Sequence, residues 1–245
     1  MKSRTLLVIV AHPDDESFPM GGTLAKYAAQ GVRVVLVSAT RGEAGIPGLD
    51  LTATACVREA ELRAAAQMLG IARLEFLGYV DGHLAEANAR EAVSKLTALL
   101  NEERPDVVIT FGPDGISGHP DHVMVHRWAT AAFGAANLSG QLFYVMPSEA
   151  TQQGCGVPPS EAVAGGPVAA IDVGAYLVTK VRATQCHASQ KPPFPGTPEE
   201  EAVRLACHEY FVLARPATAV GVLSDLFAEE EDVVTDEKGT YPDSQ

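Results

Sequence analysis

Short unbroken apolar runs alternate along the chain with longer stretches whose apolar residues have helical spacing. The first run, residues 5–10, reads Thr-Leu-Leu-Val-Ile-Val without a charged residue. Continuous rather than alternating apolar character is typical of strands that are buried on both faces, as in a parallel sheet. Runs with strand character cover residues 5–10, 32–39, 74–80, 106–111, 141–146, 168–173 and 209–213.

The stretches between these runs predict helices over residues 20–30, 53–69, 88–103, 120–136, 175–187 and 198–207. Strands and helices alternate up to residue 146, which predicts an α/β fold: a Rossmann-like, doubly wound parallel sheet in a three-layer αβα sandwich. In the strand order 3-2-1-4-5, the first and fourth strands are neighbours whose following helices lie on opposite faces. Their carboxyl ends then form the switch point at which ligands bind in such sheets.

A polar cluster, Ala11-His12-Pro13-Asp14-Asp15-Glu16, follows the first of these strands directly. A buried strand that ends in a turn needs at most one acidic residue there, whereas this one has three. His12 and Asp15 are candidate metal ligands, which leaves Asp14 unbound beside the metal. The alternative is a solvated turn with an acidic helix cap.

A second polar cluster, His119-Pro120-Asp121-His122, follows the fourth strand. Proline favours the first helical position, so His119 is expected at the cap and His122 in the first turn, pointing toward the first cluster. Two imidazoles and one carboxylate with an open fourth position are typical of catalytic zinc, although another divalent transition metal also fits. His126, one turn beyond His122, is the alternative ligand.

The two clusters together contain the parts of a metal-assisted hydrolysis of an amide or ester. A metal with an open position lowers the pKa of its water toward about 7. Asp14 is the candidate base for that water. His119, oriented by Asp121, is a candidate for stabilising the oxyanion or protonating a leaving amine, and the alternative is a plain helix cap.

Composition narrows the class of protein. The chain has 245 residues with a net charge of −13 and no cluster of Lys and Arg, which disfavours nucleic acid and anionic membranes as partners. No apolar run reaches the roughly 18 residues of a membrane span, no signal peptide is recognisable and no CxxC motif occurs. We expect a cytoplasmic protein with one domain over residues 1–228 and a flexible acidic tail over 229–245. A monomer and a homo-oligomer both remain open.

Two other classes of α/β protein explain the clusters less well. A nucleotide-binding sheet protein would carry a G-x-G-x-x-G motif after the first strand, where this chain has three acids that repel phosphate. A magnesium-binding receiver domain has no use for the histidines and is about half as long.

The residues at 11–16 and Gly118-His119-Pro120-Asp121-His122, with a weaker match at His187-Ala188-Ser189-Gln190, resemble the LmbE/PIG-L family of zinc-dependent deacetylases. The resemblance covers about residues 5 to 213. It implies removal of an acetyl group from a small molecule or glycoconjugate that contains N-acetylglucosamine. It also implies that His12, Asp15 and His122 bind the metal, that Asp14 is the general base, and that His119 with Asp121 stabilises the intermediate.

The resemblance implies further residues around the substrate. Arg58 and Asp81 occupy the places of a sugar-contacting arginine and aspartate, with Arg63 as a competitor for the arginine. Glu43 lines the pocket or is an ordinary loop acid, and His187 closes over the site or is a packed core histidine. The family leaves the substrate open, and segments 147–167 and 191–195 are expected to select it. A thiol-conjugate amidase and a catalytically silent homologue are the alternatives.

Overall fold

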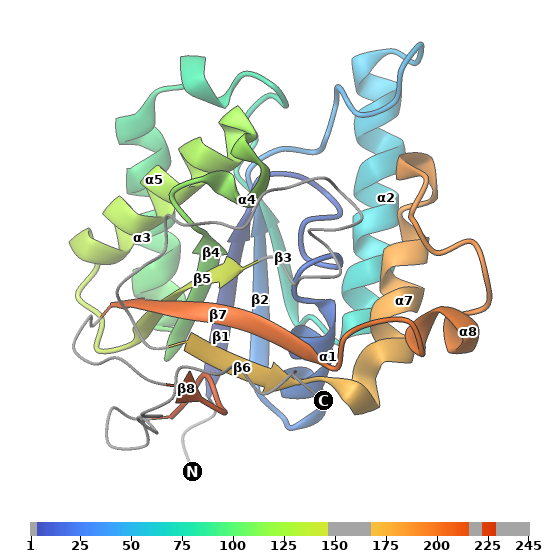
Figure 1. Ribbon diagram of the computed structural model, residues 1–245. Coiled ribbons are helices and arrows are strands. Elements are labelled where there is room, and N and C mark those ends of the chain that lie inside the picture. Colours follow the sequence, from blue (N-terminus) through green and yellow to red (C-terminus); the bar gives the residue numbers. More distant parts are fainter. Residues whose placement is uncertain (1–3, 147–167, 216–221, 229–245) are drawn as a thin grey trace.

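A computed structural model of the chain describes residues 4–146, 168–215 and 222–228. These residues form one sheet in the order β3-β2-β1-β4-β5-β7-β6-β8 (Figure 1). The strands are β1 Thr5–Val10, β2 Arg33–Ser38, β3 Arg73–Phe76, β4 Val107–Phe111, β5 Gln141–Met146, β6 Val168–Asp172, β7 His208–Arg215 and β8 Val222–Leu223.

Strands β1 to β5 are mutually parallel, which confirms the doubly wound sheet and its order 3-2-1-4-5. The two C-terminal strands predicted near residues 168 and 209 extend this sheet. β7 lies antiparallel to β5, and β6 lies antiparallel to β7 and parallel to β8. The sheet is therefore mixed, with a parallel half and an antiparallel edge.

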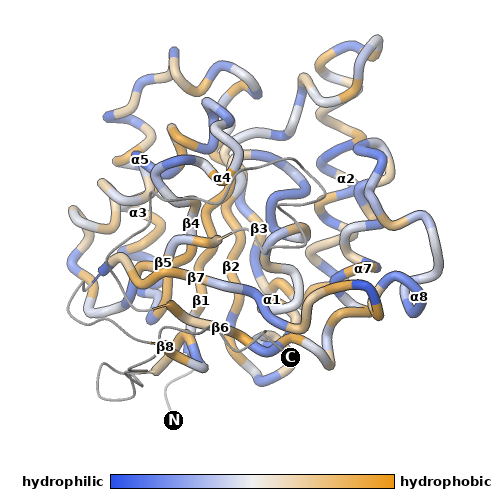
Figure 2. The backbone as a smooth tube through the Cα atoms, in the orientation of Figure 1, coloured by the Kyte–Doolittle hydropathy of each residue, from blue (hydrophilic) through white to orange (hydrophobic). Residues whose placement is uncertain are grey.

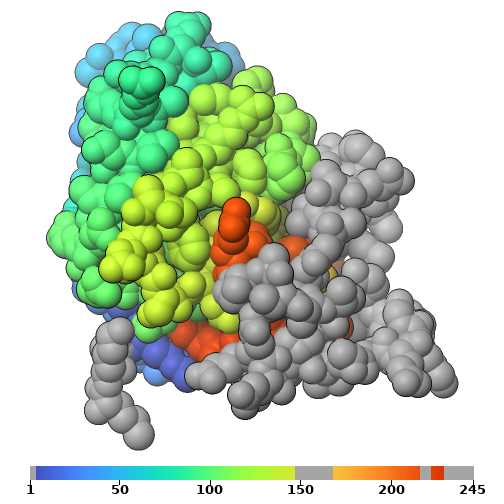
Figure 3. Space-filling view, turned by 90° about the vertical axis from the view of Figure 1, so that its left-hand side faces the viewer, coloured from blue at the N-terminus to red at the C-terminus, as the bar shows by residue number. Residues whose placement is uncertain are grey.

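Helices cover both faces of the sheet and complete the predicted three layers (Figure 1). Helices α1, α2 and α7 contact one another on one face, and α3 contacts α5 on the other. The space-filling view in Figure 3 faces this second layer. The long helices are α1 Gly21–Ala29, α2 Leu51–Leu69, α3 Ala89–Glu103, α5 Pro120–Ala135 and α7 Leu177–Cys186. The short ones are η1 Leu84–Glu86, α4 Gly115–Gly118, η3 Gly174–Tyr176, η4 Ala188–Gln190 and α8 Pro198–Ala202.

The core lies between these layers, and apolar residues concentrate in the central strands (Figure 2). All six residues of β1 are buried, because α1 and α2 cover one face of the sheet and α5 the other. Trp128 from α5 and Tyr27 from α1 are the largest side chains in the core. Burial of each Leu, Val or Ile side chain of β1 contributes about 1.5–3 kcal/mol, so packing holds in place the strand from which the first polar cluster continues.

Three further expectations concern the segment after β4, membrane-spanning helices and the boundary of the domain. The segment after β4, predicted as a loop, contains the short helix α4. No helix of the described ranges is long and apolar enough to cross a membrane. The expected irregular segment 147–167 and the acidic tail 229–245 lie outside the described residues, so the domain boundary at 228 stays a prediction.

Candidate metal centre and active site

The carboxyl ends of β1 and β4 bring the two polar clusters together. The ring centroids of His12 and His119 are 4.9 Å apart, and those of His12 and His122 are 5.3 Å apart. One ring nitrogen from each of these three histidines lies within 4.8 Å of the others. Neighbouring parallel strands end at the same edge of a sheet, so residues about 110 positions apart meet there.

The His12 ring is oriented by two buried carboxylates. Its Nε2 lies 3.1 Å from Asp121 Oδ2 and 3.0 Å from Asp81 Oδ1. Carboxylates accept hydrogen bonds, so in the neutral ring the proton belongs on Nε2 and the lone pair on Nδ1. Burial lowers the pKa of His12, but hydrogen bonds with Asp121, Asp15 and Asp81 outweigh it and raise that pKa.

The backbone fixes the His122 ring through its other nitrogen, Nδ1. Its Nδ1 donates to the Gly115 carbonyl oxygen at 3.0 Å, which leaves the lone pair on Nε2. Phe111, the last residue of β4, stacks on the ring with centroids 4.1 Å apart. Gly115 has φ +63°, and a Cβ there would lie 2.9 Å from the Cβ of His122. The turn therefore requires glycine for its close approach to the histidine.

One nitrogen of each of the two imidazole rings and both oxygens of the Asp15 carboxylate lie close together. His122 Nε2 lies 3.3 Å from His12 Nδ1 and 3.3 Å from Asp15 Oδ1, and His12 Nδ1 lies 3.6 Å from Asp15 Oδ2. Ligands of a tetrahedral ion with bonds of about 2.0–2.2 Å stand about 3.3–3.6 Å apart. The donor set and its spacing therefore fit a divalent transition metal.

Asp15 supplies the negative charge of this centre. Its Oδ2 accepts from the His12 backbone N–H at 2.8 Å, which fixes the carboxylate beside the imidazoles. Burial raises the pKa of Asp15, but His122 and His12 hold it well below its usual range. Asp15 in turn raises the pKa of His122 against the lowering effect of burial. The electrostatics favour a cation at this position.

Asp14 lies beside the three candidate ligands in a strained backbone conformation. Its φ is 112°, which a non-glycine residue adopts only when its surroundings hold it there. The Arg58 guanidinium, from α2, donates to the Pro13 carbonyl at 2.5 Å and to Asp14 Oδ2 at 3.1 Å. Burial, followed by the charge of Asp15, raises the pKa of Asp14 to about 7, although Arg58 lowers it. Such a carboxyl exchanges protons near neutral pH.

His119 occupies the N-cap of α5, with Pro120 at the first helical position, as the sequence predicts. Its Nδ1 accepts from the backbone N–H of Asp121 at 3.2 Å, so the neutral ring carries its proton on Nε2. Burial and the nearby His12 and His122 lower the pKa of His119, which keeps the ring neutral. A neutral histidine with a free Nε2–H can donate a hydrogen bond to an oxyanion.

The Asp121 side chain contacts His12. Its carboxylate accepts from Gly82 N at 2.7 Å, from Leu84 N at 3.2 Å and from His12, and it touches His119 only through its own backbone. Asp121 thus contacts His119 through its backbone N–H, while its side chain contacts His12. The first turn of α5 points this carboxylate at the neighbouring strand end, where it orients His12.

The remaining predicted residues frame the centre. Asp81 contacts His12 and accepts from Ala44 N at 3.1 Å, and Glu43 accepts from Asp81 N at 3.3 Å. Arg58 is 3% exposed and bonds to protein groups rather than facing an open pocket. Its competitor Arg63 pairs with Glu59 on the solvated face of α2.

Two histidines outside the cluster are also accounted for. His126 donates from Nδ1 to the Phe111 carbonyl at 2.9 Å and lies outside the converging ring nitrogens of the described residues. His187 is fully buried and contacts Glu16 Oε1 at 2.7 Å, so it does not close over the site. Sequence reasoning did not connect Glu16 with this buried partner. The motif His187-Ala188-Ser189-Gln190 is recognisable in the sequence. The sequence does not indicate, however, that His187 contacts Glu16.

Comparisons with known proteins show which sequences the chain resembles. The sequence model of the PIG-L family, described as GlcNAc-PI de-N-acetylase, matches residues 7–133. A 1D-myo-inositol 2-acetamido-2-deoxy-alpha-D-glucopyranoside deacetylase of Mycobacteroides abscessus is 35% identical over 93% of this chain and 99% of its own length. A protein of the same name from Saccharomonospora viridis is 36% identical over 91% of this chain and 99% of its own.

Solved structures share the architecture. A conserved protein from Thermus thermophilus matches with a TM-score of 0.64 and 29% identity, covering 88% of this chain and 96% of its own. The N,N'-diacetylchitobiose deacetylase from Pyrococcus horikoshii matches with a TM-score of 0.63 and 24% identity, covering 86% and 84%. The second likeness shows the fold alone. The family match spans both polar clusters and the strands that carry them, and the chain belongs to the PIG-L family of de-N-acetylases.

Proposed function

We propose that the protein is a zinc-dependent hydrolase that removes the acetyl group from a small molecule containing N-acetylglucosamine. The observation that carries the proposal is the convergence of His12 Nδ1, His122 Nε2 and the Asp15 carboxylate beside a second carboxylate, Asp14, whose pKa is raised to about 7. A purely structural metal site would be closed by its fourth ligand and would need no such neighbour.

The proposed reaction is amide hydrolysis. When bound by His12, Asp15 and His122, the metal supplies a Lewis acid that polarises the acetyl carbonyl and activates water. Asp14 accepts a proton as the water oxygen attacks the carbonyl carbon. His119 Nε2–H donates a hydrogen bond to the carbonyl oxygen as that oxygen gains negative charge. Asp14 then returns its proton to the amide nitrogen and the C–N bond breaks, which gives acetic acid and an amine. The remaining proton of the water passes from the acid to the amine, so the final products are acetate and an ammonium group.

The relatives indicate the substrate class. Both deacetylases compared above are named for 1D-myo-inositol 2-acetamido-2-deoxy-alpha-D-glucopyranoside, and each aligns over nearly its full length. We therefore infer that this inositol glycoside, or a close analogue, is the substrate. This substrate is polar and is not embedded in a membrane, which agrees with a cytoplasmic location of the enzyme.

Metal analysis and acetate release test the proposal together. Protein stripped with a chelator and reloaded with zinc is assayed on the inositol glycoside, N-acetylglucosamine, N,N'-diacetylchitobiose and a cysteinyl amide of the deacetylated inositol glycoside. We expect about one zinc per chain and acetate released fastest from the inositol glycoside. Cleavage of the cysteinyl amide alone would identify a thiol-conjugate amidase. Metal binding without release of any product would identify a silent homologue.

A further inference from the structure

Glu16 connects the proposed base to a distant part of the chain. Its side chain is fully buried, with Oε2 accepting from the Asp14 backbone N–H at 3.0 Å. Its Oε1 accepts from Ser17 Oγ at 2.5 Å and from His187 Nε2 at 2.7 Å. His187 is also fully buried and lies 171 residues further along the chain, directly after α7. A charge-assisted hydrogen bond between two groups withheld from water is strong and geometrically fixed.

Asp14 needs such support because its backbone is strained. A φ of 112° is unfavourable for any residue with a Cβ and persists only where several contacts impose it. Arg58 holds the Pro13 carbonyl and the Asp14 carboxylate from one side. Glu16 holds the Asp14 N–H from the other. Loss of either contact would let the peptide relax and would move the carboxylate.

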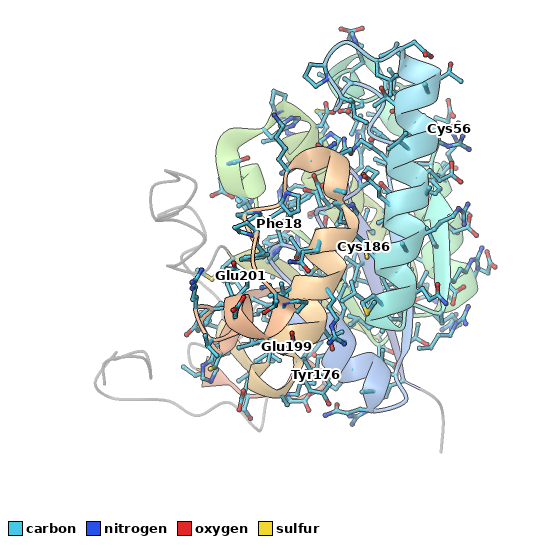
Figure 4. The ribbon with its side chains drawn as sticks, turned by 90° about the vertical axis from the view of Figure 1, so that its right-hand side faces the viewer. Phe18, Cys56, Tyr176, Cys186, Glu199 and Glu201 are labelled. Carbon is cyan, nitrogen blue, oxygen red and sulfur yellow. The ribbon has the colours of Figure 1, made fainter. Side chains whose placement is uncertain are left out.

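The two supports are joined through α2. Glu61, three residues after Arg58 and therefore on the same helix face, accepts from Ser189 N at 2.8 Å and from Ser189 Oγ at 2.7 Å. Ser189 lies two residues after His187, in η4, which contacts α2. Figure 4 shows α7, which ends at Cys186, alongside α2. These hydrogen bonds, together with the backbone of α2 between Arg58 and Glu61 and the backbone from His187 to Ser189, close a ring that begins and ends at Asp14.

We propose that His187 is a positioning residue that fixes the Asp14 carboxylate through Glu16. The inference rests on the proposed hydrolysis, in which Asp14 carries the proton. His187 touches neither substrate nor metal in this role. It keeps the 12–18 segment in its strained conformation, which an isolated strand-to-helix turn would not adopt.

A second ion pair, between Lys180 of α7 and Glu209 of β7, provides a matched control. Glu209, on β7, is 2% exposed and accepts from Lys180 Nζ, on α7, at 2.6 Å. The same carboxylate accepts from Gly22 N at 3.0 Å and Thr23 N at 2.7 Å, at the start of α1. It therefore ties α7 and β7 to α1, just as Glu16 and His187 tie the end of α7 to the 12–18 segment. Its hydrogen bonds within the described residues go to α1 and α7 rather than to Asp14.

The experiment compares His187→Leu, His187→Gln and Glu209→Gln in the zinc-loaded protein. His187→Leu should lower kcat by about 10- to 100-fold with KM within about twofold, because a misplaced reacting group loses rate rather than ground-state binding. His187→Gln keeps an N–H donor for Glu16 and should retain more of the rate than the leucine variant. Glu209→Gln should lower the melting temperature but leave kcat within about twofold of the parent.

Hydrogen–deuterium exchange gives a readout that needs no activity. In His187→Leu and, more weakly, in His187→Gln, amides of peptides covering residues 11–18 should exchange faster, while those of α1 keep their protection. Glu209→Gln should show the reverse, with faster exchange at Gly22 and Thr23. Should His187→Leu fail to fold, His187→Gln carries both measurements.

Two outcomes would overturn the positioning role: equal kcat losses in the His187 and Glu209 variants that track melting temperature, or unchanged exchange at residues 11–18. Failure of the proposed function looks different, since the unsubstituted protein would then release no acetate. The exchange pattern would still decide whether His187 holds the Asp14 segment.

Discussion

The two halves of the sheet contribute to the site in different ways. In the parallel half, the segments after β1 and β4 carry the three candidate ligands, the proposed base and His119. The antiparallel edge and its helix α7 provide none of these among the described residues. They contribute buried side chains, Glu209 and His187, that bond to the start of α1 and to Glu16.

Strand direction explains the difference. The carboxyl ends of parallel strands all lie at one edge of the sheet, so the loops that follow β1 and β4 converge on one point. Antiparallel strands end alternately at opposite edges, and their loops are dispersed. In the proposed reaction the parallel half therefore performs the chemistry, whereas the edge contributes buried contacts to the 12–18 segment and to the start of α1.

Removal of a candidate metal ligand from the parallel half should have the largest effect on bound zinc and on activity. His122→Ala deletes one of the two imidazoles, and bound zinc should fall from about one per chain to near zero, with activity lost. His126→Ala, one turn along the same helix, is the matched control. His126 contacts the Phe111 carbonyl, so its variant should keep the metal. Elemental analysis after dialysis measures both, and retained metal in His122→Ala would transfer the ligand role to His126.

Asp14→Asn should have the next largest effect. Zinc content should be unchanged, while kcat falls by about 10²- to 10⁴-fold, the usual contribution of a positioned base. Because the base must be ionised and the pKa of Asp14 is raised to about 7, the kcat/KM of the parent should decline as pH falls below neutrality. An acid limb that persists in the weakly active Asn variant would assign that ionisation to another group.

The sequence predicted well that the two polar clusters meet, and it predicted poorly which contacts support them. His12, Asp15 and His122 are predictable because they stand next to strand ends whose neighbours follow from the topology. The contacts of Glu16 with His187 and of Asp121 with His12 join residues 171 and 109 positions apart through packing of whole layers. Apolar periodicity does not encode such pairings. The short helix α4 was not predicted for a similar reason. Its glycine-rich sequence is typical of a loop, and its conformation depends on the packing of His122 against Gly115.

Asp121→Asn tests the contact of this side chain with His12, and its effect should be the smallest of the three. The Asp121 carboxylate accepts from Gly82 N, Leu84 N and His12 Nε2, and an asparagine can offer its oxygen on one side only. In either orientation the NH₂ group faces a donor. Facing His12, it would also favour the tautomer with the proton on Nδ1, the candidate ligand atom.

Asp81 still orients His12 in that variant, so the loss should be partial: about 10- to 100-fold in zinc affinity or activity. Competition with a chromogenic chelator measures the affinity. Asp81→Asn is the comparison, and it should cost less because the Asp81 side chain accepts one backbone N–H, from Ala44, where Asp121 accepts two. If Asp121 oriented His119 instead, its variant would keep full zinc affinity and lose only kcat, and the two carboxylates would then serve different histidines.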